Sequence, residues 1–459
     1  MLNDTIAAIA TPLAPSGIGI IRVSGPEAKA VVDSVFVNPS FKHILLSMES
    51  HTISYGFLLD EGKVIDEVLV SYFKGPKSFT AEDTVEINCH GGVFVLKKAL
   101  ELVIKNGARL ALPGEFTKRA FLNGRIDLSK AEAVMDVISS ESELSLKSSV
   151  SQLRGSVSEE IRSIRDEIIY EVAFIESALD DPEHISLDGY PVKLRAKTDE
   201  ILKRLSSLIK SADTGRIIKD GIKTVIIGKP NAGKSSLLNY LSGFERAIVT
   251  DIEGTTRDII EERISLGDVN LILTDTAGIR DTEDLVESIG VKKTIDSLDD
   301  ADLILYVVDS SVPLDENDLK IISLLKEKKC IVIYNKTDLK SAVDINDISG
   351  KFNGIDIVKM SSVNNEGLSD LSKLVNDMFL KGDIDVSSEV MITNLRHKEA
   401  LKEAFDSMTQ VSHSIDNEMP EDFYSIDLMN AYTSLGLIIG EEVSDDLVNE
   451  IFSKFCMGK

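Results

Sequence analysis

Tryptophan is absent from the 459-residue sequence, and cysteine, histidine and proline are scarce. The three cysteines, Cys89, Cys330 and Cys456, lie far apart without CxxC spacing, which excludes a disulfide framework and a structural zinc site. The six histidines show no metal-ligand spacing, so we interpret them as structural. No apolar run reaches the roughly 18–20 residues of a membrane helix, and the first residues resemble neither a signal nor a transit peptide. We therefore expect a soluble, cytosolic protein.

Positive charge is also in short supply, because 50 Lys and Arg residues face 76 Asp and Glu residues, for a net charge of −26. Such a surface attracts phosphate backbones poorly. If nucleic acid is a partner, a local basic patch or a second protein must supply the positive charge. The 43% of hydrophobic residues is ordinary for a folded protein, and the length suggests about three domains.

The hydrophobic pattern changes character along the chain. Up to about residue 118, strand-like runs such as Thr84–Cys89 alternate with turns, and a helix is predicted over Val93–Lys105. Apolar residues then recur every three or four positions over Val157–Leu179, which predicts a long helix, and a second helix is predicted from about Val192 to Lys210. From about residue 215 strands alternate with glycine-rich loops. Helices return near 394–415, 425–439 and 444–455. This order predicts a helical domain with an inserted α/β domain.

A phosphate-binding loop opens the inserted domain. The strand-like run Lys223–Gly228 leads into Gly228-Lys229-Pro230-Asn231-Ala232-Gly233-Lys234-Ser235, and an apolar helix over Ser236–Leu241 follows. This is the pattern G-x-x-x-x-G-K-S in a strand–loop–helix context. The glycines let backbone N–H groups surround phosphates, Lys234 offsets phosphate charge, and the Ser235 hydroxyl can ligate Mg²⁺.

Three further motifs, each after a predicted strand, indicate a guanine nucleotide. In Asp275-Thr276-Ala277-Gly278, Asp275 would hold Mg²⁺ through water and the Gly278 amide would sense the γ-phosphate. The last carboxylate of Asn335-Lys336-Thr337-Asp338 can accept two hydrogen bonds that guanine supplies and adenine does not. Ser361-Ser362 is placed to lie behind the base. These loops predict a Ras-like GTP-binding domain.

The residue that orients the attacking water is less obvious. Ile279 occupies the position at which many switch GTPases carry a glutamine, and isoleucine cannot orient water. Glu283, Asp284 and Glu287 are candidates for that role. Arg257, Arg280 or a monovalent cation near the phosphate loop are candidates for stabilising transition-state charge. Taken singly, each of these side chains more often belongs to a solvated helix surface.

The motifs resemble those of the MnmE/TrmE family of tRNA-modification GTPases, and the resemblance extends from end to end of the chain. Within the inserted domain it covers Gly228–Asn239 and Ala247–Asp258. Elsewhere the similar segments are Asp4–Ala8, Gly17–Arg22, Phe79–Asp83, Pro113–Thr117, Arg119–Gly124 and the tail Phe455–Lys459.

The resemblance implies a multidomain α/β plus all-α protein. An N-terminal α+β domain at 1–118 would bind tetrahydrofolate and dimerise, and a helical domain at 119–215 and 384–459 would carry an inserted Ras-like P-loop GTPase (G) domain at 216–383. The family forms a cytosolic homodimer that joins an FAD-dependent MnmG/GidA-type partner in a heterotetramer, without a membrane. Together they would add a carboxymethylaminomethyl-type group to C5 of the tRNA wobble uridine, with a folate one-carbon unit. We expect tRNA to be contacted mainly through the partner.

The resemblance also assigns site residues. K⁺ would be held by Asn231, Thr250, Ile252 and Thr255, and Mg²⁺ by Ser235 and Thr256. A K⁺ ion there can replace an arginine finger, and Glu287 would orient the water. The tetrahydrofolate derivative would be bound by Arg22, Glu82, Lys459 and Arg125, the last at a position that is commonly lysine in the family. The expected GTP contacts are Asn231, Ala232, Gly233, Lys234, Ser235, Ser236, Thr250, Asp251, Ile252, Glu253, Gly254, Thr255, Thr256, Asp275, Thr276, Ala277, Gly278, Asn335, Lys336, Asp338, Ser361 and Ser362.

Cys456 is a candidate nucleophile, since attack on the uridine ring would need a thiolate, and the alternative is a packed or idle thiol. Cys89 and Cys330 lie in strand-like runs and are predicted to belong to the core.

Two other functions fit part of the pattern. A ribosome-assembly switch GTPase has a similar phosphate loop, but such proteins usually carry a basic RNA-binding appendage, whereas residues 385–459 are acid-rich and lack a GxxG loop. A membrane-remodelling GTPase is favoured only by the long helices, because no basic or apolar lipid-contacting segment is present.

Overall fold

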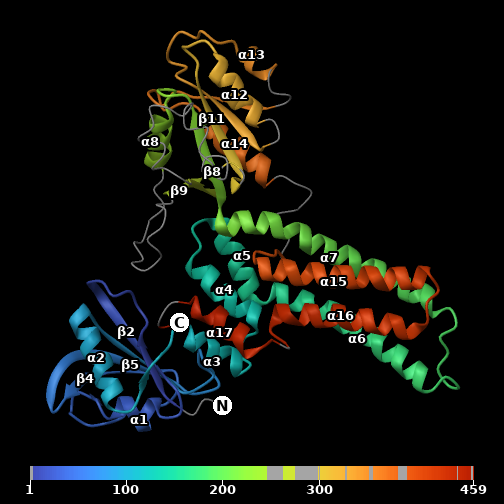
Figure 1. The fold of residues 1–459 in the computed structure, drawn as a ribbon. Coiled ribbons are helices and arrows are strands. Elements are labelled where there is room, and N and C mark those ends of the chain that lie inside the picture. Colours follow the sequence, from blue (N-terminus) through green and yellow to red (C-terminus); the bar gives the residue numbers. More distant parts are fainter. Residues whose placement is uncertain are drawn as a thin grey trace. The chain divides into compact units, whose positions relative to one another are not determined.

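The computed structural model describes residues 4–244, 262–273, 298, 300–325, 328–350, 355–380, 390–441, 443–455 and 458 (Figure 1). The chain divides into two compact units. The first combines Met1–Met135, Leu153–Glu167 and Tyr432–Lys459, and the second combines Asp136–Gln152 and Ile168–Ala431.

The first unit contains a seven-stranded sheet with the strand order β3-β4-β5-β6-β2-β1-β7. Its strands are β1 (Ile6–Ile9), β2 (Ser16–Ser24), β3 (Phe36–Val37), β4 (Thr52–Asp60), β5 (Lys63–Phe73), β6 (Thr84–Gly91) and β7 (Arg109–Leu110). All neighbouring strands are antiparallel except β1 and β7. The helices α1 (Ala28–Asp33) and α2 (Val93–Lys105) pack against this sheet, and a short 3₁₀ turn, η1 (Leu45–Ser47), contacts α1. The predicted helix over Val93–Lys105 is confirmed.

Period-two alternation explains which face of this sheet forms the core. Along β5, Val68, Val70 and Tyr72 are buried, whereas Glu67 and Leu69, which flank Val68, are exposed; Ser71, also on the other face, is buried. The inward residues join Leu96 and other α2 side chains in a single hydrophobic cluster.

Helices make up much of the remaining chain. They are α3 (Glu115–Leu122), α4 (Leu128–Ile138), α5 (Glu143–Arg154), α6 (Ser156–Asp180), α7 (Tyr190–Asp220), α15 (Leu395–Asp416), α16 (Glu421–Ile439) and α17 (Asp445–Ser453). The apolar face predicted for α6 is buried from Val157 to Ile175, while Leu179, near the end of the helix, is 44% exposed. Among the described residues, none of the helices has both the length and the apolar character needed to cross a bilayer.

The second unit contains a six-stranded sheet with the order β13-β12-β11-β8-β10-β9. Its strands are β8 (Ile222–Gly228), β9 (Glu262–Leu266), β10 (Val269–Leu273), β11 (Leu303–Asp309), β12 (Cys330–Asn335) and β13 (Asp356–Lys359), and its helices include α8 (Lys234–Phe244), α12 (Glu316–Leu325), α13 (Ile345–Ser349) and α14 (Leu368–Phe379). Only β9 runs antiparallel to its neighbour. Since the sheet lies between α7 and α15 in the sequence, the predicted insertion of an α/β domain is confirmed.

Both faces of the inserted sheet are buried, as parallel sheets require. Successive residues of β11 belong to different cores: Leu305 packs with side chains of α8 and α14, and Tyr306 packs with side chains of α12 and α13. This arrangement brings the ends of β8, β11 and β12 to one edge of the sheet, where the predicted loops begin.

The helix α7 leads directly into β8. Gly221 joins them at φ +93°, and a Cβ there would lie 2.9 Å from the carbonyl oxygen of Asn270, so only glycine fits. Across the same junction, Arg216 Nη2 lies 2.6 Å from Asp302 Oδ1, and Asp302 Oδ2 accepts a hydrogen bond from the backbone N–H of Lys223 at 3.1 Å. The G domain is therefore anchored to the helix that precedes it.

Candidate functional site

Residues 228–235 run from the last residue of β8 through a turn into the first two residues of α8, the strand–loop–helix context that the sequence predicts. Lys234 is 7% exposed, and its Nζ donates to the carbonyl oxygens of Gly228 at 2.9 Å and Lys229 at 2.8 Å. Burial holds the pKa of the Lys234 amine below its usual range. No carboxylate pairs with Lys234 in the described part of the chain, so its charge is available to offset phosphate charge.

Asn231 and Ser235 offer oxygen atoms on the same loop. Both residues are exposed, and neither side chain has a hydrogen-bond partner among the described residues. The Asn231 backbone adopts φ 61°, a left-handed conformation that asparagine tolerates. Amide and hydroxyl oxygens suit hard cations, so the described part of the predicted cation sites fits K⁺ and Mg²⁺.

The phosphate loop and the base loop are joined by Asn335. Its side chain is 2% exposed, and Nδ2 donates to the carbonyl oxygen of Ala232 at 3.0 Å. Gly233 lies directly against this amide: its φ is +102°, and a Cβ there would lie 2.1 Å from Asn335 Nδ2. The two predicted GTP-binding loops therefore form one continuous surface.

The base-recognition residues lie at the ends of β12 and β13. The Nζ of Lys336 donates to Asp309 Oδ2 at 2.6 Å and to the Asn231 carbonyl oxygen at 2.8 Å. Ser361 Oγ donates to Asp338 Oδ1 at 2.7 Å, which fixes that carboxylate and leaves Oδ2 without a partner among the described residues. Ser362 Oγ is buried and likewise has no partner in the described chain. A fixed carboxylate with one oxygen still able to accept is suited to the N–H donors of a base.

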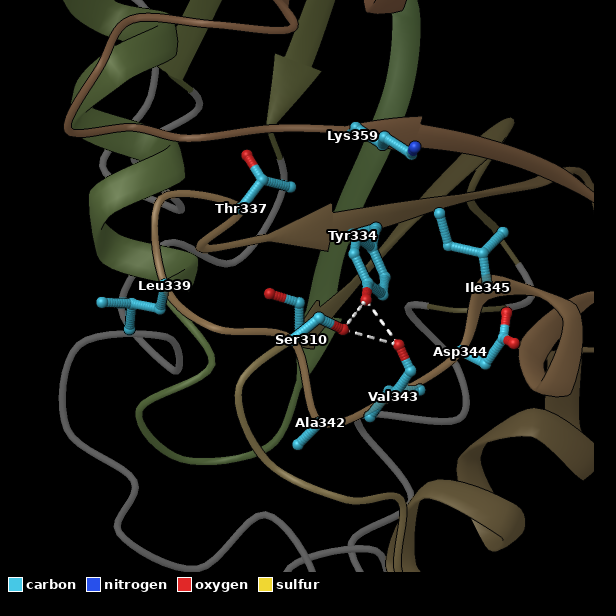
Figure 2. A pocket seen from close by; sticks show the side chains of 10 residues that line it. Ser310, Tyr334, Thr337, Leu339, Ala342, Val343, Asp344, Ile345 and Lys359 are labelled. Atoms are coloured by element: carbon cyan, nitrogen blue, oxygen red, sulfur yellow. Dashed lines mark hydrogen bonds between the residues drawn. The ribbon is translucent and has the colours of Figure 1, made fainter.

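A cavity of about 620 Å³ lies against the base loop (Figure 2). On its wall the Tyr334 hydroxyl donates to the carbonyl oxygen of Val343 at 2.6 Å and lies 2.5 Å from Ser341 Oγ. Thr337 also lines the cavity, and its hydroxyl donates to the Met360 carbonyl oxygen at 3.1 Å. These contacts brace the base loop, so the Thr337 side chain is committed to structure.

Several predicted site residues lie outside the described residues and stay predictions. They are Thr250, Asp251, Ile252, Glu253, Gly254, Thr255, Thr256, Asp275, Thr276, Ala277, Gly278, Glu287, Cys456 and Lys459, with the further candidates Arg257, Arg280, Glu283 and Asp284. The strand that precedes Asp275, β10, is present as predicted and ends at Leu273.

In the first unit, two of the predicted folate ligands meet at one aromatic ring that sequence reasoning did not single out. The Cζ atoms of Arg22 and Arg125 lie 5.2 and 5.1 Å from the centroid of the Phe79 ring. Arg22 also pairs with Glu86 at 2.8 Å. Arg125 donates to the Phe79 carbonyl oxygen at 2.8 Å and forms no ion pair with the described residues, so its charge is available to an anion. The signal for Phe79 was its place in the segment Phe79–Asp83.

Glu82, the third of these ligands, is held by residues that sequence reasoning also missed. Ser24 Oγ donates to Glu82 Oε2 at 2.9 Å, and Arg119 Nη1 lies 3.2 and 3.3 Å from the two carboxylate oxygens. Arg119, on α3, has a side chain with 0% exposure. The sequence signals for Arg119 were its place in the segment Arg119–Gly124 and its position between Phe116 and Ala120, on the apolar face of a helix.

The C-terminal tail reaches this group at Gly458. Arg22 Nη1 donates to the carbonyl oxygen of Gly458 at 3.3 Å. Gly458 has φ +89°, and a Cβ there would lie 2.5 Å from the carbonyl oxygen of Ile9 on β1. A glycine is therefore required for the tail to lie this close to β1.

The other two cysteines belong to the core, as predicted. Cys89 and Cys330 are buried, and burial raises the pKa of each thiol to about 12. Neither thiol is therefore poised to act as a nucleophile at neutral pH.

Comparison with known proteins assigns the family. Residues 5–125 match the model of the GTP-binding protein TrmE N-terminus, and residues 128–456 match the MnmE helical domain. The tRNA modification GTPase MnmE of Lachnoclostridium phytofermentans is 55% identical over 462 residues, covering 100% of each chain. That of Acetivibrio thermocellus is 49% identical over 460 residues, covering 100% of this chain and 99% of the relative. The solved G domain of the FeoB iron transporter of T. maritima is 27% identical and covers 34% of this chain and 97% of that one, with a TM-score of 0.25. The chain belongs to the MnmE/TrmE family of tRNA modification GTPases.

Proposed function

We propose that this chain is the GTP-hydrolysing subunit of a cytoplasmic complex that modifies the wobble uridine of tRNA. The complex would add a carboxymethylaminomethyl-type group to C5, using a folate one-carbon unit and an FAD-dependent partner of the MnmG/GidA type. The observation that carries the proposal is that one chain contains both a guanine-nucleotide surface and the candidate folate site formed by Arg22, Phe79 and Arg125. Full-length identity to proteins named tRNA modification GTPase supports tRNA as the substrate.

The nucleotide would be bound and activated by residues on three loops. Lys234 offsets phosphate charge, and Asp338, fixed by Ser361, selects guanine. Mg²⁺, held by Ser235 and Thr256, would neutralise charge on the β- and γ-phosphate oxygens. K⁺, held by Asn231, Thr250, Ile252 and Thr255, would supply the positive charge that an arginine finger gives in other GTPases. Glu287 would orient the attacking water, a role that Ile279 cannot fill.

The folate would be bound where α3, the loop before β6 and the tail come together. A reduced folate carries a ring with N–H donors at one end and carboxylates at the other. Glu82 is an acceptor suited to the ring, while Arg125 and Lys459 are cations suited to the carboxylates. When bound, the folate supplies the one-carbon unit, and this chain's residues hold and orient it.

An exposed apolar surface supports the proposed homodimer. On β4, Ile53 is 66% and Tyr55 is 46% exposed, and Tyr55 lies directly opposite Leu69 of β5, which is 46% exposed. Phe57 continues the same face of β4. Contiguous apolar side chains on a sheet surface are typical of protein–protein interfaces, and a second copy of this face would bury them symmetrically.

The net charge of −26 supports contact with tRNA mainly through the partner, since this surface repels phosphate. The proposal is tested by inactivating the gene and measuring wobble nucleosides of total tRNA by mass spectrometry. We expect the C5 substituent to disappear, and to return with the unaltered chain but not with Asp338→Asn. A matched control, Asn364→Ala, changes an exposed side chain of the same domain and should restore the modification. Wobble uridines that stay modified without the gene would contradict the proposal.

A further inference from the structure

One buried guanidinium gathers carboxylates from three separate segments of the N-terminal domain. Arg119 lies 2.7 Å from Asp4 Oδ1, 3.1 Å from Glu115 Oε1 and 3.2 Å from Glu82 Oε2. Its Nη1 also donates to the backbone carbonyl oxygen of Asp4 at 2.8 Å. With 0% of its side chain exposed, Arg119 has no surface with which to touch a ligand.

Arg109 shares part of this network but does not reach Glu82. It lies 2.6 Å from Asp4 Oδ2 and 2.7 Å from Glu115 Oε1. Three carboxylates therefore face two guanidinium groups, and within the described part of the chain Arg119 is the only charge partner of Glu82. Ser24, which donates to Glu82 Oε2 at 2.9 Å, is the other contact that fixes this carboxylate.

The result is a carboxylate with a set orientation and remaining acceptor capacity. The Glu82 side chain is 15% exposed, so part of it is open to a ligand. An ionised carboxylate only accepts hydrogen bonds, whereas a protonated one would also donate. A ligand edge with two adjacent N–H donors, such as N3–H and the 2-amino group of a pterin, can satisfy both oxygens in a forked geometry.

We propose that Arg119, assisted by Ser24, is a positioning residue that holds the Glu82 carboxylate in a fixed orientation as an acceptor and so makes the site specific for a ring with adjacent N–H donors. This inference rests on the proposed use of a folate. It adds that specificity for the pterin edge is set by a residue that never touches the ligand. A ring without the 2-amino group would form one hydrogen bond fewer to this carboxylate and would bind more weakly.

The test compares two ligands on four proteins. The probes are 5-formyltetrahydrofolate and its analogue without the 2-amino group, and their dissociation constants are measured by calorimetry on the full-length unaltered protein, Arg119→Lys, Ser24→Ala and Arg109→Gln. We expect the unaltered protein to prefer the amino-bearing ligand by about tenfold or more, the effect of one hydrogen bond to a charged group. Arg119→Lys keeps the charge but loses the planar fork, in which Nη2 contacts Asp4 and Glu115 and Nη1 contacts Glu82, so the preference should fall toward unity.

The other two variants separate positioning from general stability. Ser24→Ala removes a contact to Glu82 without disturbing a buried charge, and it should lower the preference in the same direction. Arg109→Gln removes a partner from Asp4 and Glu115 while leaving Glu82 untouched, so its preference should match that of the unaltered protein. If Arg119 only stabilised the fold, Arg119→Lys and Arg109→Gln would change the preference between the two ligands by similar factors.

The outcomes distinguish this inference from the proposed function. If the unaltered protein binds 5-formyltetrahydrofolate and Arg119→Lys keeps the full preference, the inference is overturned while folate binding stands. If Arg119→Lys does not fold, Ser24→Ala decides: an unchanged preference overturns the inference. If the unaltered protein binds neither ligand, the folate part of the proposed function fails and the inference falls with it.

Discussion

Replacing Asn335 by alanine tests whether the phosphate loop and the base loop act as one binding surface. The side chain is 2% exposed, and its amide donates to the carbonyl oxygen of Ala232 at 3.0 Å. Without that donor the Ala232 carbonyl loses a buried partner, which costs about 1–3 kcal/mol. The amide also packs on Gly233, 2.1 Å from where a Cβ would stand, so its removal opens a gap between the loops.

Two effects of Asn335→Ala are expected. The free energy of unfolding of the G domain falls by about 1–3 kcal/mol, which lowers the urea midpoint by about 1 M at a slope of roughly 1–3 kcal/mol per M. GTP affinity falls by about tenfold or more, because base and phosphate contacts are no longer held in one geometry. The chain contains no tryptophan, so unfolding is followed by circular dichroism and binding by a fluorescent GTP analogue.

The matched control is Asn364→Ala, which makes the same chemical change at an exposed position. Asn364 contributes its backbone N–H, and not its side chain, to a hydrogen bond with Ser361 Oγ at 3.2 Å. Its unfolding free energy should stay within about 0.5 kcal/mol of the unaltered protein. If Asn335→Ala behaves like this control and binds GTP unchanged, the contact between the two loops does not organise the site.

Three further results are expected. Asp338→Asn should weaken GTP binding by about a hundredfold and improve binding of xanthosine triphosphate, because the C2 carbonyl of xanthine can accept a hydrogen bond from the new amide. Competition titrations measure both affinities, and an unchanged GTP affinity would refute the role assigned to Asp338. Although burial opposes ionisation, hydrogen bonds from arginine, led by those of Arg109, hold the pKa values of Asp4 and Glu115 below their usual range. The ionised carboxylates therefore stabilise the fold above an unfolded-state pKa of about 4, and this stabilisation is lost as the pH falls through the folded-state pKa values. Arg109→Gln should therefore reduce the fall in melting temperature between about pH 5 and 2. A melting temperature that falls as steeply in Arg109→Gln as in the unaltered protein would count against this. In Gly458→Ala, a Cβ would lie 2.5 Å from a β1 carbonyl oxygen at a residue with φ +89°. This change should weaken 5-formyltetrahydrofolate binding by about tenfold without altering GTP affinity. A folate affinity equal to that of the unaltered protein would show that the tail is not part of the site.

The hydrophobic pattern predicted long helices such as α2, α6 and α15, because each buries one face, whereas shorter ones such as α3, α4 and α5 were not predicted. The helix α2 has the predicted bounds, and α6 extends the predicted run by one residue at each end. The helix α7, predicted to end near Lys210, continues to Asp220. Its last turns bury Ile217 and Ile218 in the core of the inserted domain, a tertiary contact that a local pattern does not contain.

The nucleotide loops could be predicted because their chemistry is local: strand, glycine-rich turn and helix follow one another in sequence. The network around Glu82 could not. Arg119 would normally be solvated on a helix, and its burial depends on carboxylates from Asp4 and Glu82, which lie far from it in sequence. Only the folded chain brings these charges together.

Steady-state GTP hydrolysis in KCl and in NaCl at equal ionic strength tests most directly whether a bound cation supplies the catalytic charge. Because Ile279 cannot orient water, the proposed mechanism depends on K⁺ at Asn231 and its neighbours and on Glu287. We expect hydrolysis to be much faster in KCl, and Asn231→Ala and Glu287→Ala to lose that gain. Equal rates in the two salts would contradict cation-assisted catalysis and would favour a ribosome-assembly type of switch instead.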